Sequence, residues 1–174
     1  MPPPTTRISF RTWCEDDLPL ALSLWGNAEV ARFIYASQPS REEIEARLRR
    51  EIATQREHRV QYWPIFSCEG GAHLGCAGLR PHDDVDVFEL GVHLLPAHWG
   101  RGLANEAAKG VIAHAFDTLH ARSLFAGHGP ANEASRRMLT RLGFRHTHDE
   151  LYAPTGLMHP SYRLTSSEYA APPA

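Results

Sequence analysis

Two glycines separated by a single arginine, Gly100 and Gly102, directly precede an alanine-rich run with the periodicity of a helix. The first N–H groups of a helix have no partner inside it, and the helix dipole makes that end positive. Glycines at such a start leave the backbone bare, so an anion can approach it closely. The spacing therefore predicts an anion-binding loop, most simply for a pyrophosphate. A tight turn that lets the helix pack closely on a sheet is the alternative.

This loop does not have the spacing of the common nucleotide-binding loops. A Walker loop requires G-x-x-x-x-G-K-[ST], and the sequence contains no such run. A dinucleotide fingerprint that started at Gly100 would require glycine where Asn105 stands. A nucleotide-binding domain is thus disfavoured.

The elements that must position this loop alternate along the chain in the order β-α-α-β-β-β-α-β-α-β-β, which predicts one mixed α/β domain over residues 1–174. Ser40 and Glu43 have the spacing of a capping box, Asn132 is a helix N-cap, and Gly143 is a left-handed C-cap. Period-2 and period-3.6 patterns give the remaining bounds. Strands are expected at 7–11, 61–68, 73–79, 85–95, 122–128, 151–154 and 161–165, and helices at 15–25, 40–58, 101–120 and 132–143.

Composition excludes several classes of partner. The chain has 174 residues and a net charge of −2, so neither nucleic acid nor a membrane surface is an expected partner. No apolar stretch has membrane-span length, and the N-terminus lacks the apolar core of a secretory signal. Three cysteines, an odd number without metal-type spacing, indicate reduced thiols and a cytoplasmic protein. Residues 1–5 and roughly the last eight are expected to fray, which leaves an ordered core over about 7–169.

The eleven histidines do not indicate a metal site. His93 and His98, like His146 and His148, lack standard zinc spacing, so a surface or loop role is expected for them and no metal is predicted. His128 differs because it ends a short strand near the predicted site, where it could tune a base or contact an amine.

Two motifs at a fixed separation resemble a known family. ELGVHLLPAHWGRGLANEA (89–107) followed by GPANEASRRMLTRLGF (129–144) is similar to the GNAT superfamily of acyl-CoA-dependent N-acetyltransferases. The acyl-CoA loop of that family reads Q/R-x-x-G-x-G/A, and residues 99–104 fill it, with Trp99 in place of Gln/Arg. The Trp99 variant and the downstream N-x-x-S…L-G-F resemble the branch of ribosomal-protein N-terminal (alanine/serine) acetyltransferases. The resemblance spans about residues 7–169.

The resemblance implies a GNAT-like fold and a place for acetyl-CoA. The fold would be a mostly antiparallel central sheet with splayed central strands and about four helices. Backbone N–H groups from Arg101 to Asn105 would hold the pyrophosphate, the N–H of Leu94 would polarise the thioester carbonyl, and Asn132 would contact the pantetheine. The complete predicted cofactor-binding set is Leu94, Trp99, Gly100, Arg101, Gly102, Leu103, Ala104, Asn105 and Asn132.

Two residues are predicted to be catalytic. An amine attacks only when neutral, and a carboxylate such as Glu89 could remove its proton directly or through a water. The resemblance implies that Ser135 would protonate the leaving CoA thiolate, with Tyr152 as the backup acid. Glu89 could instead be an exposed strand residue, Asn132 a simple helix cap, and Ser135 a serine that satisfies backbone groups.

The predicted activity is direct transfer of an acetyl group from acetyl-CoA to a primary amine, with a protein N-terminal α-amine as acceptor. No cysteine has a recognisable base nearby, so no acetyl-enzyme is expected. A small-molecule amine (an antibiotic, a polyamine or an amino acid) and a catalytically silent acyl-CoA-binding module remain alternatives. The family habit makes a homodimer plausible. Several aromatic residues are expected to shape the acceptor side, unless they are simply core: Trp13, Trp25, Phe33, Tyr35 and Trp63.

Overall fold

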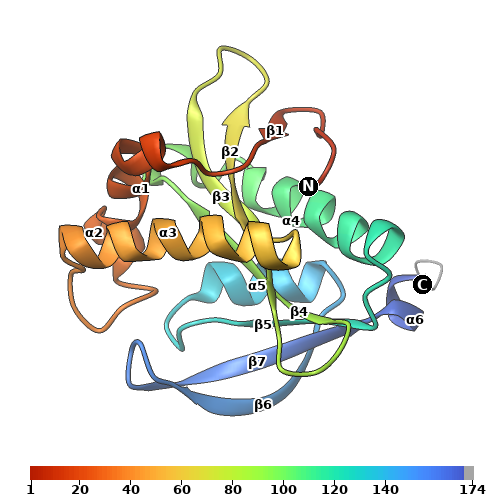
Figure 1. Ribbon diagram of the computed structural model, residues 1–174. Coiled ribbons are helices and arrows are strands. Elements are labelled where there is room, and N and C mark those ends of the chain that lie inside the picture. The colour runs from red at the N-terminus through yellow and green to blue at the C-terminus, as the bar shows by residue number, and fades with distance from the viewer. Residues whose placement is uncertain (171–174) are drawn as a thin grey trace.

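The computed structural model describes residues 1–170, which form one seven-stranded sheet of order β1-β2-β3-β4-β5-β7-β6 (Figure 1). Neighbouring strands are antiparallel except β4 and β5, which are parallel. The strands are β1 (Ile8–Phe10), β2 (Tyr62–Ser67), β3 (His73–Pro81), β4 (Val87–Leu94), β5 (Ser123–Gly127), β6 (Arg145–Tyr152) and β7 (Leu157–Thr165). The expected α/β class and mostly antiparallel sheet are confirmed.

Four helices have eight residues or more, as expected, and two short ones add to them. Their bounds are α1 (Leu18–Trp25), α2 (Ala28–Ala31), α3 (Arg41–His58), α4 (Leu103–Ala113), α5 (Glu133–Arg141) and α6 (Ser166–Tyr169). The capping box at Ser40 and the Asn132 cap are both present, and Gly143 has the left-handed φ of +88°. None of the described helices is both long and apolar enough to cross a membrane.

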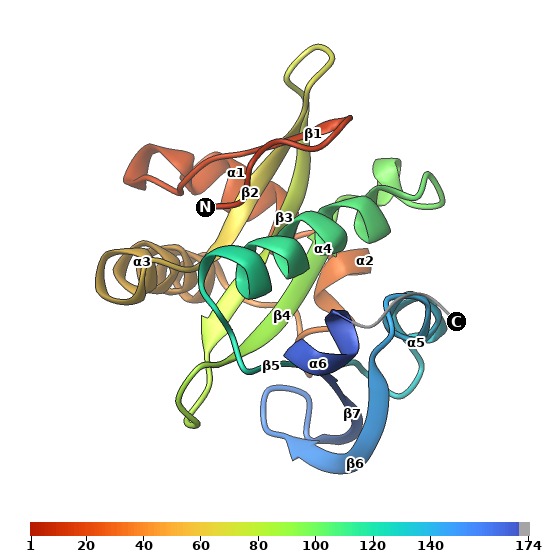
Figure 2. The same ribbon diagram turned by 90° about the vertical axis from the view of Figure 1, so that its right-hand side faces the viewer.

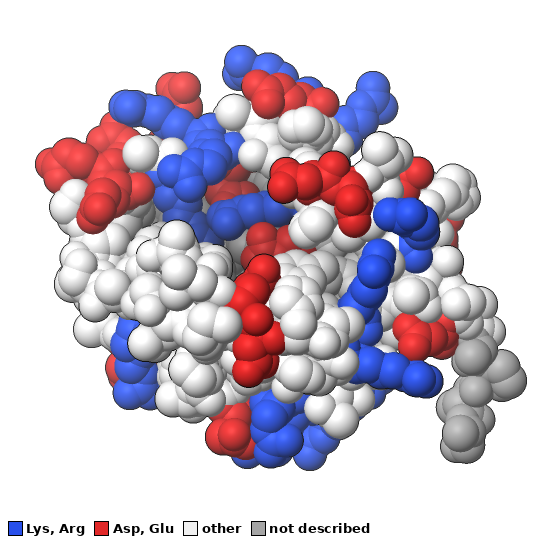
Figure 3. Space-filling model, turned by 90° about the horizontal axis from the view of Figure 1, so that it is seen from below, with Lys and Arg blue, Asp and Glu red and all other residues white. Residues whose placement is uncertain are grey.

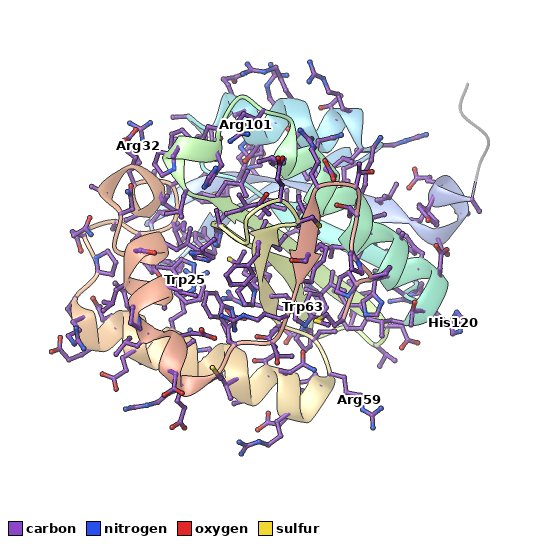
Figure 4. The ribbon with its side chains drawn as sticks, turned by 90° about the horizontal axis from the view of Figure 1, so that it is seen from above. Trp25, Arg32, Arg59, Trp63, Arg101 and His120 are labelled. Carbon is purple, nitrogen blue, oxygen red and sulfur yellow. The ribbon has the colours of Figure 1, made fainter. Side chains whose placement is uncertain are left out.

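The helices cover both faces of the sheet. Figure 2 shows α1 and α3 on one side and α4 with α5 on the other. Each side has its own apolar cluster, and the two large tryptophans Trp25 and Trp63 belong to different clusters. Both lie in the interior in Figure 4, whereas Arg59 and His120 project outward. Trp63 therefore packs on the α4 side as a core residue, which is the second of the two roles expected for it.

The two central strands separate after a short stretch of pairing. β4 pairs with β5 only from Val87 to Glu89, opposite Ser123 to Phe125. Beyond Glu89, the strand continues to Leu94 with a partner on its β3 side alone. The expected splay of the central strands is therefore present, and it leaves one edge of β4 open in the middle of the sheet.

Strand β6 differs from the sequence-based bounds. It begins at Arg145, six residues before the predicted start, and Ala153 and Pro154 lie in the turn that follows it. The strand lies at the edge of the sheet, and almost all of its residues are exposed. An edge strand in water needs no apolar alternation, so a period-2 search cannot find it.

The expected fraying of residues 1–5 is also wrong. The hydroxyl of Thr5 donates to the carboxylate of Glu106 at 2.7 Å, and Pro2 is fully buried. At the other end, residues Ser166–Tyr169 form α6, capped by Thr165. Residues 171–174 of the expected C-terminal fray lie outside the described part of the chain.

Candidate active site

The glycines before α4 both have left-handed backbone conformations. Gly100 has a φ of +72° and Gly102 a φ of +75°, a region that L side chains rarely adopt. A Cβ at Gly100 would meet nothing within 4 Å, and one at Gly102 would meet only the Arg7 guanidinium, at 3.7 Å. Close packing on the sheet therefore does not explain why these two positions are glycines. The left-handed backbone conformation explains it, and the space beside the backbone is open.

Helix α4 begins with unpartnered donors. The N–H of Glu106 donates to the carbonyl of Gly102 at 3.1 Å, which makes Glu106 the first residue with an intrahelical bond. The N–H groups of Leu103, Ala104 and Asn105 have no such partner and point out of the positive end of the helix. The loop is held from outside, because Arg7 binds both the Glu106 carboxylate and the Arg101 carbonyl.

A cavity of about 570 Å³ opens at this helix start. Three arginines line it, Arg32, Arg137 and Arg141, against the single carboxylate of Glu133. Asn105 and His98 also line it, although the Asn105 Oδ1 and the His98 Nδ1 are buried behind the wall without a hydrogen-bond partner. The net positive lining and the free N–H groups fit a polyanionic ligand such as acetyl-CoA.

Eight of the nine predicted cofactor-binding residues line this cavity, and Arg101 does not. Arg101 is exposed on the loop above the helix start, as Figure 4 shows, and its carbonyl is taken by Arg7. Arg101 was expected to bind the pyrophosphate through its backbone N–H, and this stays a prediction. The residues of the prediction that do line the cavity are Leu94, Trp99, Gly100, Gly102, Leu103, Ala104, Asn105 and Asn132.

The open edge of β4 supplies backbone donors and acceptors to the same cavity. The N–H of Leu95 donates to the carbonyl of Leu74 at 2.9 Å, and antiparallel bonding alternates along the register Gly75↔Leu94 to Pro81↔Phe88. The backbone groups of Leu94 and Val92 therefore point away from β3, toward the splay. The Leu94 carbonyl accepts a hydrogen bond from the Trp99 indole at 2.8 Å.

A second cavity, of about 310 Å³, lies on the other side of the splay. It brings together the predicted base Glu89, the predicted acid Ser135, the backup acid Tyr152, and His128. Its walls carry the carboxylates of Glu89 and Glu150 and no lysine or arginine. The lower face of the molecule is hollowed in Figure 3, and acidic and basic side chains meet in the depth of the hollow.

The two cavities adjoin, because seven residues line both. Ser135 stands at this junction, and so do residues of β4 and of the segment after α2. A group held in the first cavity can therefore reach one held in the second. The shared residues are Phe33, Ile34, Val92, His93, Asn132, Ser135 and Met138.

Glu89 lines the second cavity together with Tyr62 and Tyr152. Burial raises the pKa of Tyr152, and the negative charge of Glu89 adds to that effect. Burial also raises the pKa of Tyr62, again with a contribution from Glu89. Both phenols therefore stay protonated. Because Glu89 lines the cavity, the alternative of an exposed strand residue that points away from the site is not what the structure shows.

Asn132 caps α5, and the Ser135 hydroxyl takes no part in the cap. The Asn132 Oδ1 accepts the N–H of Ser135 at 3.1 Å, so the asparagine caps α5 as predicted. The Ser135 hydroxyl has no hydrogen-bond partner within residues 1–170, so it does not satisfy the backbone. That hydroxyl stands free at the junction of the two cavities.

The histidines around the second cavity have partners other than a metal. The His128 Nδ1 lies 2.8 Å from the Gly129 carbonyl, and its Nε2 lies 3.4 Å from the Tyr162 hydroxyl. The His159 ring packs against that of Tyr152, with centroids 4.7 Å apart and the ring planes tilted by 31°. Within residues 1–170, no three His, Cys, Asp or Glu side chains are grouped as metal ligands would be.

Cys76 lies beside His93 but lacks the properties of a nucleophile. Its Sγ is 3.6 Å from the His93 Nδ1. Burial raises the pKa of the thiol to about 12, and burial with the Arg47 charge holds the pKa of His93 well below its usual value. A thiolate–imidazolium pair requires both shifts in the opposite direction.

We therefore expect Cys76 to resist alkylation in the folded protein at pH 8, while Cys14 and Cys68, which are exposed, react within minutes. Mass spectrometry of peptides after iodoacetamide treatment, with a urea-unfolded sample as the control, measures this. Rapid labelling of Cys76 in the folded protein would contradict its burial.

Several residues of the cavities were not predicted from the sequence. Arg137 and Arg141 are spaced i, i+4 on α5, a spacing that places both on one face of the helix. Phe33 was expected on the acceptor side and lines both cavities, whereas Trp25 and Tyr35 contact Arg47 behind them. His93 was expected in a surface or loop role, and that expectation is wrong, because it stands at the junction.

Comparisons with known proteins agree with this geometry. Residues 7–145 match the family model of the acetyltransferase (GNAT) domain. The uncharacterized N-acetyltransferase YoaA of Bacillus subtilis (strain 168) is 26% identical over 143 residues, which cover 81% of each chain. The uncharacterized N-acetyltransferase p20 of Bacillus licheniformis is 25% identical over 144 residues, which cover 81% of this chain and 80% of that protein.

Solved structures show the same fold at lower identity. An acetyltransferase (GNAT family) from Bacillus anthracis has a TM-score of 0.79 at 15% identity and covers 92% of this chain and 96% of its own. RimL, described as a ribosomal L7/L12 alpha-N-protein acetyltransferase, has a TM-score of 0.77 at 15% identity, over 92% of this chain and 91% of its own.

Proposed function

The chain belongs to the GNAT acetyltransferases, and from that premise we propose that it transfers the acetyl group of acetyl-CoA to the α-amine at a peptide or protein N-terminus. The observation that carries the proposal is the pair of adjoining cavities with opposite charge. The arginine-lined cavity suits a polyanionic acyl donor, and the carboxylate-lined cavity suits a cationic amine. Donor and acceptor would then meet at Ser135 and Val92.

In this proposal the open backbone binds and polarises the donor. The unpartnered N–H groups at the start of α4 hold the pyrophosphate, as helix N-termini do for anions. The Leu94 N–H, which points into the splay, donates to the thioester oxygen and stabilises the negative charge that develops there.

Side chains of the second cavity move the protons. Glu89 accepts a proton from the ammonium group of the acceptor, directly or through a water, and frees the lone pair of nitrogen. The nitrogen attacks the thioester carbon, a C–N bond forms, and the C–S bond breaks. The Ser135 hydroxyl, which has no other partner within residues 1–170, donates its proton to the departing thiolate. It regains a proton from the attacking nitrogen, which loses it to become the neutral amide.

A small cationic amine such as a polyamine is the second candidate acceptor. The absence of lysine and arginine from the second cavity favours it as much as a peptide α-amine. The acidic loop Asp83–Asp84–Asp86 adds nothing to this candidate, because it is exposed and lines neither cavity.

The decisive assay measures release of free CoA thiol from acetyl-CoA in the presence of different amines. We expect turnover with short peptides that have a free N-terminus, and none with the same peptides after N-acetylation. Lysine side chains within the N-acetylated peptides serve as the internal control for α-amine selectivity. Turnover with polyamines and with no peptide would show that the acceptor is a small cationic amine and not a peptide N-terminus. Tight acetyl-CoA binding without turnover on any amine would identify a catalytically silent module.

A further inference from the structure

His93 is surrounded by hydrogen-bond donors at one of its ring nitrogens. The Nδ1 lies 3.3 Å from the Trp25 Nε1, 3.5 Å from the Arg47 guanidinium and 3.6 Å from the Cys76 Sγ. An indole N–H and a guanidinium can only donate, and the thiol is protonated. The Nδ1 must therefore accept, and the neutral ring carries its proton on Nε2.

The surroundings keep this tautomer fixed. The Arg47 guanidinium stacks 4.2 Å over the Trp25 ring and donates to the Tyr35 hydroxyl at 2.6 Å. Figure 4 shows Trp25 directed from α1 into the interior. A second positive charge beside the Nδ1 would be repelled by Arg47, so the imidazole stays neutral. His93 is thus a donor of fixed orientation and fixed charge.

The other ring nitrogen faces the cavities. The two nitrogens of an imidazole point in nearly opposite directions, and the Nδ1 points into the cluster behind the wall. The Nε2 has no hydrogen-bond partner within residues 1–170, and it is not among the fully buried polar atoms that lack one. It therefore reaches the surface of the wall that the two cavities share.

The direction of the His93 side chain indicates that it contacts the acceptor amine and not acetyl-CoA. Side chains alternate along a strand, so His93, Gly91 and Glu89 share one face of β4. A Cβ at Gly91 would collide with the Tyr62 ring, which packs edge-on against His93 with centroids 5.6 Å apart. The opposite face, with Leu90 and Leu94, belongs to the apolar cluster under α4. His93 thus shares its face with the predicted base Glu89.

We propose that His93 is an acceptor-binding residue, whose Nε2–H donates a hydrogen bond to an oxygen that the acceptor carries close to its reacting amine. The inference rests on the proposed amine acetylation, and it restricts the acceptors to amines that carry such an oxygen. A peptide N-terminus has such an oxygen in its first carbonyl, and amino sugars have neighbouring hydroxyls. Simple alkylamines and polyamines have none. A site that offers a buried donor discriminates against a ligand that leaves the donor unpaired.

Two substitutions separate this donor from the structural role of the ring. In His93→Asn, the amide oxygen can still accept from Trp25 and Arg47, but no donor reaches the Nε2 position. In His93→Gln, the longer side chain can place its amide N–H there. The acceptors are alaninamide, which has a carbonyl beside its amine carbon, and sec-butylamine, which has the same branching without oxygen. The measured quantity is the ratio of kcat/KM for the two amines.

We expect His93→Asn to lower this ratio about tenfold relative to the wild type, and His93→Gln to restore most of it. Because the ratio is compared between proteins, the different pKa values of the two amines cancel. Calorimetric titration should give the same acetyl-CoA Kd for both variants and the wild type, and thermal unfolding checks that each is folded.

An unchanged ratio in folded His93→Asn would overturn the inference while the acetyltransferase proposal stands. A weakened acetyl-CoA Kd with both amines slowed equally would also overturn it, because the donor would then face the cofactor. If the wild type acetylates neither amine nor any peptide, the proposed function itself fails, and the inference fails with it.

Discussion

Replacing Gly102 by glutamate is expected to weaken acetyl-CoA binding about a hundredfold, because a carboxylate would stand against the pyrophosphate at the positive end of α4. Like charges brought together in a binding site cost several kcal/mol, and about 2.7 kcal/mol corresponds to this factor. The left-handed φ of +75° adds backbone strain to the variant. Isothermal titration with acetyl-CoA measures the loss, and ATP tests whether the loop distinguishes acyl-CoA from other polyphosphates.

The control for that strain is Gly71→Glu in the turn between β2 and β3. Gly71 has a φ of +66°, and a Cβ there would also meet nothing within 4 Å. The substitution introduces the same side chain at a similar backbone conformation, and the position lies outside both cavities. We expect Gly71→Glu to bind acetyl-CoA like the wild type. Equal affinity for acetyl-CoA in Gly102→Glu and Gly71→Glu would show that the loop is not part of the acetyl-CoA site.

Replacing Glu89 by glutamine is expected to lower kcat about a hundredfold at pH 7 and to leave the Kd for acetyl-CoA unchanged. General bases contribute factors of this order, since they supply the neutral amine at the moment of attack. The deficit should shrink as the pH rises above the pKa of the acceptor amine, about 8 for a peptide N-terminus, because the amine then arrives already deprotonated. Initial rates of thiol release between pH 6.5 and 10 give this profile.

Glu150→Gln is the matched variant for that experiment. It removes the same charge from the wall of the same cavity, where Glu150 accepts a hydrogen bond from the Ser161 hydroxyl. We expect a higher KM for the amine and a kcat close to that of the wild type. A large kcat loss in Glu150→Gln with none in Glu89→Gln would assign the base to Glu150.

The local features of the fold could be predicted from the sequence, because each depends on a few neighbouring residues. A capping box at Ser40, an asparagine cap at Asn132 and a left-handed glycine at Gly143 need no tertiary context, and all three are present. The open edge of β4 has no local signal of its own, and it was expected only from the resemblance of residues 89–107 and 129–144 to a family. The polar edge strand β6 had neither kind of signal, and its start was placed too late.

The site was predicted unevenly for a similar reason. Backbone groups of the loop could be read from the glycine spacing, whereas the role of His93 depends on Trp25, Arg47 and Cys76, which come from three other elements. Its one local signal was alternation, which puts it on the same face as Glu89. The arginines of the first cavity also come from separate segments, α5 and the residue after α2.

The opposite charges of the two adjoining cavities also bear on how the reaction ends. In the proposed reaction the acceptor enters as a cation, and its acetylated form is a neutral amide. The walls that carry Glu89 and Glu150 therefore attract the substrate and have no such attraction for the product. The arginines of the other cavity would retain CoA, whose phosphates are unchanged by the transfer. Departure of the acetylated acceptor is thus favoured before that of CoA, an order of product release that follows from the charges of the walls alone.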